Sequence, residues 1–183
     1  MKKLLILSVL ILAILATNAQ EPLASKKGVK KEKKSERKAL RKLEGTEVSY
    51  QSKQAFIADF GDVPGASWRR SANFDEVTFT KNGVAQTAYY DADSKLVGTV
   101  TEKTFSDLPA RARDYITLKY PNYNIDKIIM FDDNEENDTD MIMYGYQIDD
   151  QDNYFAELTR NNQTIVLQIT PEGMVSFFTQ LKK

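Results

Sequence analysis

The residue types best suited to chemistry in this sequence are carboxylates, and one group of them is dense. Oxygen ligands at such density are typical of calcium sites. An EF-hand loop needs Gly at its sixth position and Glu at its twelfth, but a loop starting at Asp132 has Asn137 and Met143 there. The sequence therefore predicts a solvated acidic loop, with calcium binding as the alternative. The group has six acids within nine residues: Asp132, Asp133, Glu135, Glu136, Asp138 and Asp140.

A second pair of carboxylates, Asp91 and Asp93, lies in one predicted turn. Glycoside hydrolysis needs two carboxyl groups across a cleft, about 5 Å or about 6.5–9.5 Å apart. Asp in a turn instead accepts hydrogen bonds from its own backbone. The pair therefore predicts a turn and not a catalytic site.

The residues that are missing exclude most other chemistry. The 183-residue chain has no His and no Cys. Without them it lacks a His-dependent nucleophile, a disulfide, thiolate chemistry and the usual structural zinc site. Its 8 Gly residues form no phosphate-binding loop. We therefore expect no catalytic residues, no cofactor and no metal: the protein is predicted not to be an enzyme.

The first nineteen residues have the pattern of a signal peptide. Lys2 and Lys3 precede an apolar run at 4–16, and small or polar residues lead to a predicted cut between Ala19 and Gln20. Thirteen residues of helix span about 20 Å, which is less than the roughly 30 Å hydrocarbon core of a membrane. The sequence predicts a periplasmic or secreted protein with no membrane span after cleavage.

Residues 20–45 are predicted to form a flexible basic arm. Between Lys26 and Lys42 there are ten Lys and Arg residues against two Glu, a net charge of +8, whereas residues 43–183 carry a net charge of −10. A block of like charge repels itself and stays solvated. The arm could act as a tether, or could bind anionic envelope polymers or lipid head groups, and such binding would weaken with salt. Docking of the arm on the acidic body of the same chain is a third possibility. Export and the lack of aromatic residues in the arm argue against nucleic acid.

The rest of the chain reads as two copies of a helix followed by strands. Helices are predicted at 50–60 and 110–120 from apolar spacing and from Pro and Gly at their ends. The first is followed by a short strand at Trp68 and by strands at 73–80, 84–90 and 96–101. Further strands are expected at about 123–131, 141–148, 153–159, 163–169 and 174–178. The predicted units are 46–105 and 106–183, which share one sheet or pack closely.

The clearest local signal is Asn82-Gly83, which predicts a two-residue hairpin turn. That turn pairs Val77 with Ala88 and places them on an apolar face with Phe79 and Tyr90. The other face is polar, and Tyr and Thr on such a face suit protein binding. An ordinary solvated sheet face is the alternative. The candidate partner-binding residues are Glu76, Thr78, Thr87 and Tyr89 on this face, with Trp68 as either a core residue or an anchor.

These motifs resemble the PepSY-like, beta-lactamase-inhibitor-like exported proteins of Bacteroidetes. The resemblance covers about residues 50–180, with one departure: Ser94-Lys95 stands where the family usually has Asp-Gly. It implies an α+β fold of two tandem units, each a helix and an antiparallel sheet of about four strands, with a binding or inhibitory role and no enzymatic activity. It is carried by the pieces Phe56 to Trp68, Phe79 to Val97 and Leu108 to Ile125.

Three hypotheses follow. The first is a non-enzymatic exported binding module that inhibits or regulates another envelope or secreted protein. The second is an envelope scaffold that the basic arm holds to anionic polymers. The third is a calcium-responsive module that uses residues 132–140.

Overall fold

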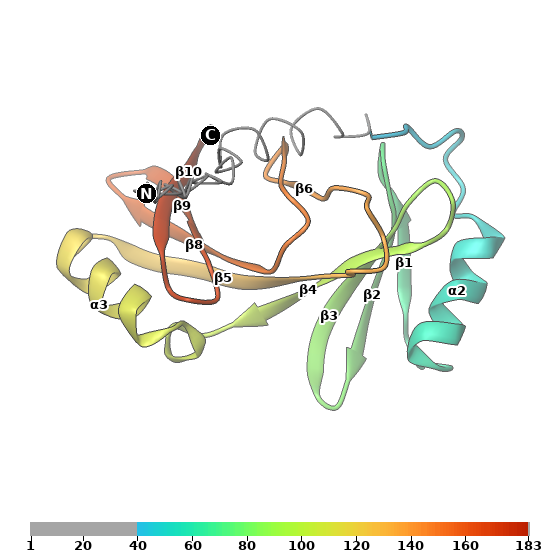
Figure 1. Ribbon diagram of the computed structural model, residues 1–183, viewed down its shortest axis with the longest axis horizontal. Coiled ribbons are helices and arrows are strands. Elements are labelled where there is room, and N and C mark those ends of the chain that lie inside the picture. The colour runs from blue at the N-terminus through green and yellow to red at the C-terminus, as the bar shows by residue number, and fades with distance from the viewer. Residues whose placement is uncertain (1–39, 183) are drawn as a thin grey trace, which may run out of the picture. The chain divides into compact units, whose positions relative to one another are not determined.

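The computed structural model describes residues 40–182. The predicted signal peptide and residues 20–39 of the predicted arm lie outside the described residues. The elements, shown in Figure 1, are α2 (Tyr50–Phe60), β1 (Ser67–Arg70), β2 (Asp75–Lys81), β3 (Val84–Tyr90), β4 (Leu96–Lys103), the 3-10 turn η1 (Phe105–Asp107), α3 (Ala110–Lys119), β5 (Asn124–Asp133), β6 (Ile142–Met143), β7 (Tyr146–Gln147), β8 (Asn153–Arg160), β9 (Gln163–Ile169) and β10 (Val175–Leu181).

Eight strands form one antiparallel sheet, in the order β1-β2-β3-β4-β5-β8-β9-β10. The sheet passes from the first predicted unit to the second through the pairing of β4 with β5, in which Val100 lies opposite Phe131. The prediction of an α+β fold is confirmed. The prediction of two units with a sheet each is not, because the sheet is continuous. The expected boundary at residue 105 falls in η1, on the link from β4 to α3.

Both helices pack on the same face of this sheet, which we call the helix face. α2 begins after Ser49, whose Oγ accepts a hydrogen bond from the Ser52 N–H, and it buries Phe56 against β2 and β3. α3 buries Ala112 and Ile116 against β5, β8 and β9. Since the two helices cover separate sets of strands, the helix face carries two apolar clusters and not one.

The opposite face is covered at its centre by residues 134–152, the connection from β5 to β8. Met141, Met143 and Ile148 of this segment pack on Phe131 and Phe155 in the third apolar cluster. In Figure 1 the connection lies on the side of the sheet away from α3. The single strand predicted at 141–148 is wrong: the segment forms a separate ribbon of β6 and β7, which turns at Tyr144-Gly145 with positive φ at both residues.

The last residues of the predicted arm lie against the sheet domain. Leu40 packs on the apolar cluster beneath the 134–152 segment. The Leu43 N–H donates to the Ala72 carbonyl at 2.8 Å, and the Arg41 guanidinium pairs with Asp93 at 2.6 Å. The chain therefore contacts the sheet domain from residue 40 onward, five residues before the predicted end of the flexible arm.

Candidate functional site

The predicted hairpin register places the candidate residues as expected. Thr78 lies opposite Thr87 and Glu76 opposite Tyr89, on the face away from α2. Asn82 and Gly83 have φ of 53° and 78°, the left-handed values that a two-residue turn of this kind requires. The local sequence therefore fixes which side chains share this face.

The outer part of this face is open and carries hydroxyl groups. The Thr78 and Thr87 hydroxyl oxygens lie 3.0 Å apart across the strands. Thr78 is exposed and Thr87 is half-buried. We call these two residues, with the exposed Thr80 and Ala85 beside them, the Thr78–Thr87 face. Because the β-branched Thr side chains of this face are stiff, ordering them against another surface would cost little side-chain entropy.

An ion pair borders the Thr78–Thr87 face on the side of the edge strand. Arg69 of β1 lies opposite Glu76 and its guanidinium pairs with the Glu76 carboxylate. The Glu76 residue is only 8% exposed, whereas the Arg69 side chain is 74% exposed. The guanidinium is therefore exposed at the border of the face, whereas the carboxylate is not. The sequence analysis did not identify Arg69. The alternation of side chains in β1 could have located it, because Arg69 is two residues from Ser67, which lies opposite Thr78, and therefore points to the same face.

Tyr89 forms the inner border of the face, where the 134–152 segment begins to cover the sheet. Its ring meets Phe74 edge-on, with centroids 5.9 Å apart, and it packs on the apolar cluster beneath that segment. Burial and the nearby Glu76 charge raise the pKa of Tyr89 to about 12, so the phenol is neutral at physiological pH. Tyr89 supports the edge of the face more than it extends the exposed surface.

Trp68 lies on the helix face, away from the other four candidates. It is opposite Val77 in the pairing of β1 with β2. Its ring packs edge-on against Phe56 at 5.6 Å and near Tyr90 at 6.2 Å. The structure thus brings together Glu76, Thr78, Thr87 and Tyr89 and separates Trp68 from them.

The Asp91 carboxylate is fully used in holding local structure. Its Oδ1 accepts hydrogen bonds from the Asp93 and Lys95 N–H groups at 2.8 and 3.0 Å. Its Oδ2 accepts from Asn137 Nδ2 at 3.2 Å and Thr139 Oγ1 at 3.0 Å. The carboxylate therefore closes the β3–β4 turn and ties the 134–152 segment to it.

The acidic segment is only partly the solvated loop that was predicted: the side chains of Asp132, Glu135, Glu136 and Asp138 are exposed, but other residues of the segment are held against the sheet. Asn137 and Asp140 are 7% and 8% exposed. Desolvation, with repulsion from Asp152 and Asp132, raises the pKa of Asp133 to about 6. Among residues 40–182, no group of three or more Asp or Glu side chains is arranged to hold a metal ion. The same residues include no helix long and apolar enough to cross a membrane.

Comparisons with known proteins bear on the fold. No protein-family model matches the chain, and a search of curated proteins gives no match. A DUF2874 family protein from Bacteroides uniformis is 14% identical, with a TM-score of 0.58 over 70% of this chain and 86% of its own. A protein from Bacteroides eggerthii, provisionally described as periplasmic, is 14% identical, with a TM-score of 0.58 over 74% of this chain and 88% of its own.

A BLIP-like protein from Bacteroides fragilis is 13% identical, with a TM-score of 0.56 over 76% of this chain and 93% of its own. The PepSY-like part of the resemblance stays a prediction, since none of these three structures carries that description. The chain therefore has the fold of a BLIP-like protein and of DUF2874 family proteins.

Proposed function

We propose that this protein is an exported, non-enzymatic binding module that inhibits or regulates another envelope or secreted protein. The observation that carries the proposal is the Thr78–Thr87 face: an open patch of sheet with stiff hydroxyl side chains beside the exposed Arg69 guanidinium. The absence of His and Cys from the sequence supports binding over catalysis.

The location of the face also supports protein binding. The open part of this sheet face ends where the 134–152 segment covers the apolar centre. A partner would contact the hydroxyl pair and the guanidinium first, and Arg is enriched in protein interfaces. The likeness to a BLIP-like protein is consistent with this role.

The proposal is tested by placing two large charged side chains on the face. Thr78→Arg with Thr87→Arg should weaken capture of a partner from envelope and secreted fractions at least tenfold, because the added side chains prevent close approach of a second surface. Hydrogen exchange of the complex should show protection over β2 and β3.

The sheet offers a matched control on the same side. Thr159 lies opposite Thr164 in β8 and β9, and their hydroxyl oxygens are 2.6 Å apart. Thr159→Arg with Thr164→Arg makes the same chemical change far along the sheet and should leave capture intact. Equal loss in both double variants, or loss only in the control, would overturn the proposal.

A further inference from the structure

The helix face has an open groove over its central strands. α2 covers β2 and β3, and α3 covers β5, β8 and β9, so the strands between these two clusters have no helix above them. The groove has a volume of about 750 Å³. Its floor and walls include Gln86, Thr101, Lys103, Met130, Asp132 and Tyr154.

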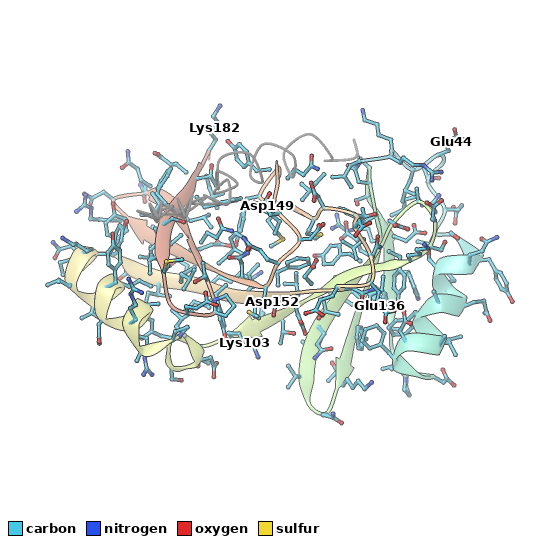
Figure 2. All side chains as sticks on the ribbon, viewed as in Figure 1. Glu44, Lys103, Glu136, Asp149, Asp152 and Lys182 are labelled. Atoms are coloured by element: carbon cyan, nitrogen blue, oxygen red, sulfur yellow. The ribbon has the colours of Figure 1, made fainter. Side chains whose placement is uncertain are left out.

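Two of the charged residues that line this groove, Asp132 and Lys103, lie at opposite ends of its central strands, and Lys81 and Asp133 line it as well. Asp132 is opposite Thr99, and Lys103 is opposite Ile128, in the pairing of β4 with β5. The two charged residues are therefore four positions apart along the strands, about 13 Å, and on the same face of the sheet. Asp152 lines the acidic end as well. Figure 2 shows Asp152 and Lys103 along the central strands, whereas Asp149 lies on the other side of them.

An apolar side chain, Met130, lies in the middle of the groove. Met130 lies opposite Thr101 on one side and opposite Tyr154 on the other, so these three side chains form the floor halfway between the charges. All three line the groove. A bound chain would thus meet an anionic, an apolar and a cationic position in that order.

The charged groups at the ends have partners of opposite charge only at longer range: the Lys103 charge favours the ionised form of Asp107 as well as that of Asp132. Within residues 40–182, neither the Asp132 carboxylate nor the Lys103 ammonium makes a hydrogen bond or an ion pair. Desolvation and repulsion from Asp152 raise the pKa of Asp132, and the more distant Lys103 only partly offsets them. A cation at the acidic end would therefore be favoured, as would an anion beside Lys103.

We propose that this groove binds an extended peptide segment of a partner protein, with a basic side chain at Asp132 and Asp152, an apolar side chain over Met130 and an acidic side chain at Lys103. In an extended chain, residues i, i+2 and i+4 point to one side and span about 13 Å, which matches the spacing of the groove. This surface is on the opposite side of the sheet from the Thr78–Thr87 face, and the inference does not depend on the proposed function.

The test uses the full chain and a labelled peptide, acetyl-Ser-Lys-Thr-Leu-Thr-Glu-Ser-amide, in a fluorescence anisotropy titration at low salt. Lys103→Glu should weaken binding of this peptide roughly tenfold, because attraction becomes repulsion. The same variant should instead prefer the peptide with Lys in place of Glu. The Asp132→Lys variant should prefer the peptide in which Glu replaces Lys, so that Glu stands at both charged positions.

Lys127→Glu is the matched control, since Lys127 is exposed on β5 outside the groove, with its ammonium 3.7 Å from Glu102. It changes the net charge by the same amount and should leave binding unchanged. The inference is wrong if the mixed-charge peptide shows no binding up to about 1 mM, if Lys127→Glu matches Lys103→Glu, or if no switch of preference occurs. Thr78→Arg with Thr87→Arg should not affect peptide binding, so failure here and failure of the proposed function are separate results.

Discussion

Thr139 donates a hydrogen bond from its hydroxyl to Asp91 Oδ2 at 3.0 Å, although the two residues are 48 positions apart. With the bond from Asn137, this contact joins the β3–β4 turn to the segment that covers the centre of the sheet. Because the Asp91 residue is only 8% exposed, its carboxylate relies on these donors in place of water.

The first prediction concerns this contact. Asp91→Ala should lower the free energy of unfolding by about 2–4 kcal/mol, because four donors lose their acceptor. Thr139→Val should cost about 1 kcal/mol. Urea denaturation measures both. Asp93→Ala is the control: its ion pair with Arg41 is exposed at 61% and 66% and should contribute little. Equal losses from Asp91→Ala and Asp93→Ala would contradict the role assigned to Asp91.

The second prediction concerns Gly98 in β4. A Cβ at this position would lie 2.5 Å from the Asp132 carbonyl oxygen and 2.6 Å from the Phe131 ring. Gly98→Ala should therefore destabilise the protein by about 1–3 kcal/mol through overpacking, with a lower melting temperature. Thr99→Ala, one residue further along the same strand, is the control and should have a smaller effect. A neutral Gly98→Ala would show that the Asp132 carbonyl and the Phe131 ring can both shift at no cost.

The third prediction concerns Asp133 and pH. The pKa of its carboxyl group is raised from 3.8 to about 6 in the folded protein, so the folded state binds a proton that the unfolded state releases. The resulting stabilisation is present below pH 3.8 and is lost as the pH rises through about 6. Asp133→Asn should remove this contribution, on the order of 1 kcal/mol after solvent screening.

Urea denaturation of wild type and Asp133→Asn between pH 4 and pH 8 measures this effect. The variant should gain stability relative to wild type as the pH rises. Two profiles that stay parallel over this range would show that Asp133 does not titrate in it.

The fourth prediction concerns Asp75, whose pKa is shifted downward, in the opposite direction to that of Asp133. Burial alone would raise its pKa, but hydrogen bonds from Arg70, Ser49 and Ser52 outweigh burial and hold the pKa below 3.8. Its stabilisation is therefore present above pH 3.8 and is lost as the pH falls through the folded-state pKa. Arg70 Nε lies 2.7 Å from Asp75 Oδ1, and the Arg70 side chain is only 11% exposed.

Asp75→Asn should cost about 3–5 kcal/mol at neutral pH, because it leaves a buried guanidinium without its counter-ion. Its cost should shrink as the pH falls below 3.8, where wild type begins to lose the same interaction. Denaturation at pH 7 and pH 3 gives both values. Glu76→Gln is the comparison and should cost less, since its partner Arg69 is 74% exposed and stays solvated when the Glu76 charge is lost.

The sequence by itself determined the local elements. Apolar spacing and end signals located α2 and α3, and Asn82-Gly83 set the register of β2 and β3, because the left-handed turn that these two residues favour permits one pairing. The alternation of the strands then placed Thr78 and Thr87 on one face.

Only the tertiary structure decided what covers each face and which distant charges meet. The ribbon of β6 and β7 was mistaken for one strand, since its apolar Met141, Met143 and Ile148 reflect packing on another segment and not a sheet period. Trp68 lies on the helix face because of the register in which β1 pairs with β2. The four residues of β1 do not specify that register by themselves. The bond from Thr139 to Asp91 and the spacing of Lys103 from Asp132 both depend on strand pairing and chain crossing over long separations, which local propensity cannot encode.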